Sequence, residues 1–153
     1  MSDTNAPFGL VVDDDAVILT DACQILEDAG FRVLTAMDAD EAVPLLERHG
    51  EDITVLFTDV EMPGKLNGFG LARLCAERWP ETAVLVASGR AIPCDDDLPP
   101  KAVFVRKPFS AEVVHARLQA LLPDGQKPEP LKQRNASASA EPPLRWHEAQ
   151  GSR

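Results

Sequence analysis

Long hydrophobic runs are missing from this sequence of 153 residues. No apolar stretch approaches the roughly 18 residues that a membrane-spanning helix needs. Residues 1–10 also lack the basic region and the apolar stretch of a secretion signal. We therefore expect a cytoplasmic protein that does not enter a membrane.

Cysteine is scarce, with Cys23, Cys75 and Cys94 as the only three. Their number is odd and none of them forms a CxxC pair, so neither a disulfide framework nor a zinc–thiolate site is indicated. Cys23 and Cys75 lie in segments of helical periodicity, where a reduced cysteine packs as a small apolar residue. We expect free thiols and no metal bound through sulfur.

Positive charge is scarce in most of the chain. Residues 1–122 contain 10 Lys/Arg and 21 Asp/Glu, a net charge of −11, whereas residues 123–153 have a net charge of +1. A domain this acidic repels the phosphodiester backbone, so we expect no direct binding to nucleic acid. A metal cation or a basic protein surface is the more natural partner.

Short apolar runs alternate with segments of helical periodicity between residues 8 and 122. Continuous apolar strands separated by helices predict an α/β fold, with a parallel sheet covered on both faces. Right-handed crossovers make such a sheet doubly wound, and five strands in this length favour the flavodoxin-like order 2-1-3-4-5. The expected strands are residues 8–12, 31–36, 53–58, 83–87 and 102–105; the expected helices are residues 15–29, 69–78, 110–122 and one that begins after Asp38.

Two segments depart from this alternation. Residues 91–100, where a fourth helix would lie, contain three prolines and three consecutive aspartates. Both residue types disfavour a helix, so we expect this helix to be short or missing and its segment to be mobile. Residues 123–153 contain five prolines and a polar middle, and we expect them to be a disordered tail that follows a domain of residues 1–122.

Polar residues follow four of the expected strands. Because the carboxyl ends of parallel strands share one edge of the sheet, these residues should meet there. Carboxylates at about 4 Å repel one another by roughly 4 kcal/mol per pair at an effective dielectric constant near 20, so the cluster needs a cation. A site of oxygen ligands without His or Cys suits Mg²⁺. The residues in question are Asp13-Asp14-Asp15, Asp59, Ser88-Gly89 and Lys107-Pro108-Phe109.

Four motifs at these positions together resemble the receiver domain of bacterial two-component response regulators, in its stand-alone, single-domain form. The resemblance covers roughly residues 7–122. Each motif alone is weak, and the combination in this order at strand ends is specific. The motifs are Asp13-Asp14, the run from Thr58 to Gly64, the run from Val86 to Gly89, and Lys107-Pro108-Phe109.

The resemblance implies a role for each matching residue. Asp59 matches the phospho-acceptor, and Lys107 matches the lysine that pairs with the phosphoryl group. The Lys107–Pro108 bond is similar to one that is cis in the family. The implied Mg²⁺ ligands are the side chains of Asp14 and Asp59, the main-chain carbonyl of Glu61, and Asp13 through water; the implied switch residues are Ser88 and Phe104.

The family's activity implies a switch controlled by phosphorylation rather than an enzyme with an external substrate. A sensor histidine kinase or a histidine phosphotransfer protein would donate the phosphoryl group to Asp59. The output would be contact with a downstream protein or competition for phosphate. Because Gly89 stands where the family commonly has a larger residue, we expect water to reach the phosphorus and the aspartyl phosphate to be short-lived. Glu61 and Arg90 flank the site and could either position or block that water.

Two other functions would account for part of the sequence pattern. A phosphatase of the haloacid-dehalogenase type also uses an aspartyl nucleophile, but it carries Asp-x-Asp on its first strand. In this sequence the second aspartate of that motif is replaced by Glu61, and the strand that would carry the nucleophile is the third. A pseudo-receiver that acts as a scaffold without phosphorylation is disfavoured by the intact acidic cluster and by Lys107.

Overall fold

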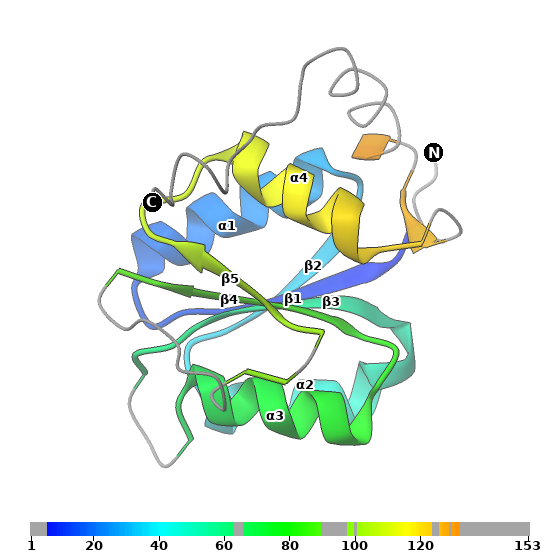
Figure 1. Ribbon diagram of the computed structural model, residues 1–153. Helices are drawn as coiled ribbons and strands as arrows, with labels where there is room; N and C mark the ends of the chain where they lie inside the picture. Colours follow the sequence, from blue (N-terminus) through cyan, green and yellow to red (C-terminus); the bar gives the residue numbers. More distant parts are fainter. Residues whose placement is uncertain are drawn as a thin grey trace.

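The computed structural model places a five-stranded parallel sheet between two pairs of helices (Figure 1). It describes residues 6–62, 66–89, 98–99, 101–123, 126–128 and 130–131. Helices α1 and α4 cover one face of the sheet, and α2 and α3 cover the other. In chain order the elements are β1 (Phe8–Val12), α1 (Ala16–Asp28), β2 (Arg32–Ala36), α2 (Ala39–His49), the short 3-10 helix η2 (Gly50–Asp52), β3 (Ile53–Asp59), α3 (Gly68–Arg78), β4 (Ala83–Ser88), β5 (Val103–Arg106) and α4 (Ala111–Leu121).

The three central strands are apolar on both faces, which is why they lie inside the sheet. Successive side chains of a strand point to opposite faces. In β1, Leu10 and Val12 pack toward α2 and α3, whereas Val11 packs toward α1 and α4. The same alternation separates Leu56 from Phe57 in β3. Each face therefore has its own apolar core.

Short polar side chains fix where the helices begin. Asp15 accepts hydrogen bonds from the backbone N–H groups of Val17 and Ile18, which lack partners within the first turn of α1. Asp38 accepts from the N–H of Glu41 at 3.0 Å, and the Glu41 carboxylate accepts from the N–H of Met37 at 2.8 Å. Asp38, after which a helix was expected to begin, therefore caps α2.

The strand order β2-β1-β3-β4-β5 confirms the fold class predicted from the sequence. The order places β3 at the centre of the sheet, between β1 and β4. The prediction that a fourth helix in residues 91–100 is short or missing falls largely outside the described residues. Only residues 98 and 99 of that segment are described, and neither is helical.

The chain after α4 corrects one prediction. The disordered tail was expected to begin at residue 123, yet Leu131 is 0% exposed and belongs to the apolar core that contains residues of α1 and α4. The Gln119 side-chain amide donates a hydrogen bond to the Leu131 carbonyl oxygen at 3.1 Å. The packed domain therefore extends to residue 131, and residues 132–153 lie outside the described part of the chain.

Gly30 shows how closely this segment approaches the domain. Its φ of +103° is a conformation that favours glycine, and it ends the turn after α1. A Cβ atom at this position would lie 2.6 Å from the Cβ of Pro128, which is itself buried. Glycine therefore allows the segment around Pro128 to pack against the end of α1.

Among the described residues, none of the helices has both the length and the apolar character required to cross a bilayer.

The buried position of Leu131 predicts that the end of the domain is needed for its stability. Leu131→Ala should lower the free energy of unfolding by about 2–5 kcal/mol, the usual cost of such a cavity. A chain cut after Pro123 should be destabilised at least as much. Val17→Ala is the control, because Val17 is 77% exposed and its truncation should change stability by less than about 0.5 kcal/mol. Urea unfolding gives these values, and an unchanged midpoint for Leu131→Ala would contradict the packing.

Candidate functional site

Three carboxylates meet at the carboxyl edge of the sheet. In the β1–β3 register Val12 pairs with Thr58, so Asp13 and Asp59, the residues that follow, occupy neighbouring strand ends. Each of Asp13, Asp14 and Asp59 offers a carboxylate oxygen within 4.8 Å of the others. The cluster that was predicted from the sequence is therefore present in the fold.

The local backbone holds two of these carboxylates inside the protein. Asp13 and Asp59 are each 4% exposed, whereas Asp14 faces solvent. The backbone N–H of Asp13 donates to the Ala36 carbonyl of β2, and its carboxylate accepts from the N–H of Asp15. Asp14 thus leaves the site open to water on one side.

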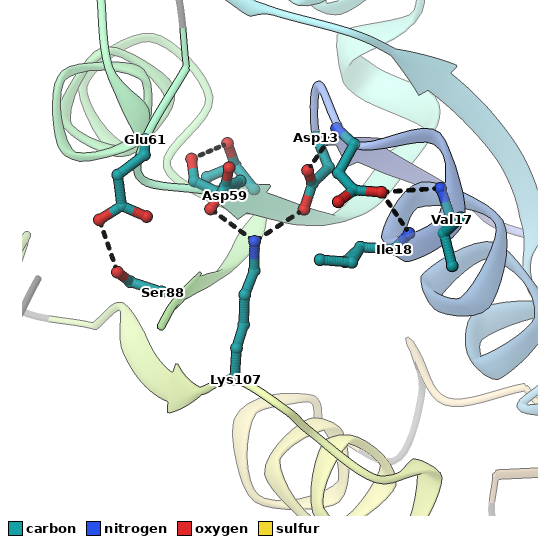
Figure 2. Close-up of polar contacts among 9 residues, drawn as sticks. Asp13, Val17, Ile18, Asp59, Glu61, Ser88 and Lys107 are labelled. Atoms are coloured by element: carbon teal, nitrogen blue, oxygen red, sulfur yellow. Dashed lines mark hydrogen bonds and ion pairs between the residues drawn. The ribbon is translucent and has the colours of Figure 1, made fainter. Parts of the chain in front are cut away.

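Lys107 supplies the positive charge of the site (Figure 2). Its Nζ lies 2.8 Å from Asp59 Oδ1 and 3.1 Å from Asp13 Oδ2, and only 15% of its side chain is exposed. The backbone N–H of Lys107 donates to the Ser88 carbonyl of β4. The ammonium therefore bridges the two buried carboxylates.

Pro108 and Phe109, the two residues after Lys107, fix the backbone at this position. The Lys107–Pro108 peptide bond is cis, as the resemblance implied. The Phe109 ring packs on Phe57 of β3 with 5.1 Å between ring centroids. This contact joins the start of the β5–α4 connection to the centre of the sheet.

Burial and charge shift the proton affinity of the site. Burial raises the pKa of Asp59, the hydrogen bond from Lys107 partly offsets this, and the charge of Asp13 raises it again, so that the pKa is about 6. Burial lowers the pKa of Lys107, but its hydrogen bonds to Asp59 and Asp13 outweigh that effect and the pKa is raised overall. Lys107 is therefore a permanent cation at neutral pH.

Ser88 and Glu61 form a second polar contact beside the cluster. Ser88 ends β4, is 0% exposed, and its hydroxyl donates a hydrogen bond to Glu61 Oε2 at 2.7 Å. Figure 2 shows this contact next to Asp59. Glu61 was singled out in the sequence for its main-chain carbonyl, and the bond made by its side chain was missed.

Phe104 and Gly68 occupy supporting positions. Phe104 of β5 is partly buried and packs with the core on the α2 and α3 side of the sheet. Gly68 begins α3, and a Cβ there would lie 2.0 Å from the carbonyl oxygen of Asp59. Glycine is thus required where α3 meets the end of β3, a role that the sequence gave no reason to assign.

The donor set fits a hard divalent cation. Among the residues that the structure describes, it contains carboxylate oxygens from three residues and no His or Cys ligand, and one of these carboxylates faces water. Mg²⁺ prefers such ligands and usually keeps several waters. Asp14 and Asp59 could hold the ion directly.

Comparison with known proteins assigns the family. The sequence profile of the response regulator receiver domain matches residues 10–119. Together with the β2-β1-β3-β4-β5 sheet and the acidic edge, this match shows that the chain belongs to the receiver-domain family of two-component response regulators. Receiver domains bind Mg²⁺ at an acidic pocket and interact with histidine kinases or phosphotransfer proteins.

Relatives of known sequence are longer than the matched region. The chain is 44% identical over 89 residues to the hydrogenase transcriptional regulatory protein HoxA of Cupriavidus necator. This match covers 58% of this chain and 17% of HoxA. It is 33% identical over 123 residues to the alkaline phosphatase synthesis transcriptional regulatory protein PhoP of Bacillus subtilis, covering 74% of this chain and 47% of PhoP. The chain therefore spans less than half the length of both relatives.

Solved receiver structures match the described fold over nearly their whole length. A response regulator receiver protein from Sinorhizobium medicae is 27% identical with a TM-score of 0.70, and the match covers 76% of this chain and 94% of that one. The chemotaxis response regulator CheY4 of Vibrio cholerae is 26% identical with a TM-score of 0.66, covering 76% and 99%.

The raised pKa of Asp59 predicts a pH-dependent stability in metal-free solution. A carboxyl group whose pKa is raised by folding stabilises the fold below its unfolded value of 3.8, and that contribution is lost as the pH rises through about 6. The side chain in Asp59→Asn cannot ionise, so this variant should keep the stabilising contribution of the neutral group at high pH. The stability advantage of Asp59→Asn should therefore grow between pH 4 and pH 7, by at most about 3 kcal/mol.

Urea unfolding at several pH values in a chelator measures this difference. Asp21→Asn, an exposed carboxylate in α1, controls for the loss of one negative charge. A difference between Asp59→Asn and the unmodified protein that stays constant with pH would contradict the raised pKa.

Proposed function

We propose that this chain is a phospho-accepting response regulator that receives a phosphoryl group on Asp59 in a Mg²⁺-dependent reaction. The observation that carries the proposal is the position of the Asp59 carboxylate. It is buried at the end of the central strand and forms an ion pair with Lys107. One of its oxygens lies within 4.8 Å of carboxylate oxygens of Asp13 and Asp14. A nucleophilic carboxylate, a fixed cation and an oxygen-rich metal site are what transfer to an aspartate requires.

Each residue has a defined part in the proposed reaction. An Asp59 oxygen attacks phosphorus, the phosphorus–nitrogen bond of a donor phosphohistidine breaks, and the imidazole leaves with a proton. Lys107 pairs with one phosphoryl oxygen and Ser88 donates a hydrogen bond to another. Bound Mg²⁺ would neutralise the charge that develops on the phosphoryl oxygens.

The proposed metal ligands are those that the family resemblance implies, and the carboxylate cluster supports them. The side chains of Asp14 and Asp59 and the main-chain carbonyl of Glu61 would hold the ion, with Asp13 acting through water. Asp13 already accepts hydrogen bonds from Lys107 and from the N–H of Asp15, which favours an indirect role. Phe104 is proposed as the aromatic switch residue.

The proposed donor is a sensor histidine kinase or a histidine phosphotransfer protein in the cytoplasm. The proposed output is contact with a downstream protein, or competition with other receivers for phosphate. The net charge of −10 favours a protein partner over direct nucleic-acid contact.

The proposed function predicts phosphorylation at Asp59. Phosphoramidate and Mg²⁺ should add one phosphoryl group, which intact-protein mass spectrometry detects. Asp59→Asn should add none because its amide is a poor nucleophile. Asp14→Ala should label slowly because it loses a metal ligand, and Asp21→Ala serves as an exposed control on α1. Equal labelling of Asp59→Asn would refute the assignment.

The second prediction concerns the lifetime of the phosphoryl group. Gly89 leaves space beside the site, so water should reach the phosphorus. A Cβ at this position would meet Lys107 Cβ at 3.6 Å, an ordinary contact, so Gly89→Ala should fold normally. The added methyl group should slow the decay of the phosphoprotein several-fold in a radiolabel chase. Faster decay in Gly89→Ala would contradict this account of access.

A further inference from the structure

The contact between Ser88 and Glu61 ties the ends of two neighbouring strands together. Ser88 is the last residue of β4, and Glu61 lies two residues beyond Asp59 at the end of β3. The Ser88 hydroxyl is fully buried and donates to Glu61 Oε2 at 2.7 Å, a short bond to a carboxylate. Hydrogen bonds to a charged acceptor are about twice as strong as neutral ones.

A hydroxyl has a single proton to donate. In the proposed function, Ser88 donates that proton to a phosphoryl oxygen on Asp59. In the unphosphorylated protein the same proton is donated to Glu61. The two hydrogen bonds exclude each other, so the phosphoryl group must compete with a carboxylate of the protein itself.

We propose that the Glu61 side chain is an internal latch that holds Ser88 in the unphosphorylated state and sets the threshold for switching. The proposal rests on the proposed function of Asp59 and adds a regulatory residue to it. Glu61 acts through Ser88, so it is a positioning residue and takes no part in phosphoryl transfer through its carboxylate.

The charge of the phosphoryl group supplies the means of release. A phosphoryl group on an aspartate brings strong acceptor oxygens and negative charge next to the Glu61 carboxylate, which already raises the pKa of Asp59 by its charge. Phosphorylation thus gives the Ser88 hydroxyl a stronger acceptor, a phosphoryl oxygen, and repels its previous acceptor, the Glu61 carboxylate. Opening the latch is therefore coupled to the chemistry at Asp59.

The other contacts of the site leave Ser88 as the group that must move. Lys107 Nζ already lies 2.8 Å from Asp59 Oδ1, so it needs no large rearrangement to reach a phosphoryl oxygen. The Ser88 carbonyl accepts from the backbone N–H of Lys107, which fixes the end of β4 to the end of β5. The hydroxyl can change acceptors by rotation of its side chain, and the backbone then responds.

A double-mutant cycle tests the latch. Beryllofluoride, which mimics a phosphoryl group on aspartate, is titrated into the full chain by calorimetry at saturating Mg²⁺. The proteins compared are the unmodified chain, Glu61→Ala, Ser88→Ala and the double variant. Glu61→Ala removes the hydrogen bond from Ser88, a repulsive charge and the other contacts of the side chain. On the Ser88→Ala background it removes all of these except the hydrogen bond. The difference between the two effects isolates the hydrogen bond.

We expect Glu61→Ala to tighten beryllofluoride binding about tenfold more in the presence of Ser88 than on the Ser88→Ala background. The affinity for Mg²⁺ alone is measured for each protein, so that an effect on the metal is separated from the latch. Glu77→Ala, an exposed carboxylate of α3, controls for charge removal, and Glu61→Gln keeps the size of the side chain.

The outcomes separate the latch from the function on which it rests. If the two backgrounds agree within about threefold, the effects are additive and the latch is wrong, while labelling of Asp59 stands. If the unmodified chain neither binds beryllofluoride nor labels with phosphoramidate, the proposed function fails and the latch fails with it.

Discussion

The site depends on the repulsion between carboxylates that the sheet brings together. The β1–β3 pairing places Asp13 and Asp59 side by side at 4% exposure each, where water screens them poorly. Lys107 offsets this repulsion by forming an ion pair with each carboxylate. For that, β5 must lie beyond β4 and the connection after it must be held in place, which the packing of Phe109 on Phe57 achieves. The electrostatic constraint at one edge therefore explains why the strand order and the following connection take the form they have.

The two edges of the sheet have different tasks. At the carboxyl edge, the solvent-facing carboxylate of Asp14 leaves one side of the site accessible to an ion and a ligand. At the opposite edge, Pro128 and Leu131 close the end of the domain beside Gly30 and the end of α1. Burial at this edge stabilises the fold without restricting the site, because the segment lies away from the strand ends that carry the carboxylates. Stability and binding are therefore supplied by different parts of the same small domain.

The sequence was sufficient for the sheet and for the placement of the carboxylates. Apolar strands alternating with amphipathic helices leave few topologies, and in a parallel sheet the residue after each strand must lie on a common edge. It was insufficient where a contact depends on the packed structure. Leu131 is a single leucine among prolines and polar residues, so no periodicity marks it as core. Gly68 is needed because of a backbone approach from α3, and the bond between Ser88 and Glu61 joins residues 27 positions apart.

The unphosphorylated site is already satisfied by partners within the protein. Lys107 binds Asp13 and Asp59, Ser88 donates to Glu61, and the Asp13 carboxylate accepts from the backbone of Asp15. A phosphoryl group on Asp59 therefore gains the Ser88 hydrogen bond only by displacing Glu61. A ligand shifts a conformational equilibrium only by the difference between its interactions with the two states, not by their sum. The strength of these internal contacts thus decides how completely phosphorylation of Asp59 can convert the domain. The contact between Ser88 and Glu61 is one that can be removed without substituting Asp59, Asp13 or Lys107.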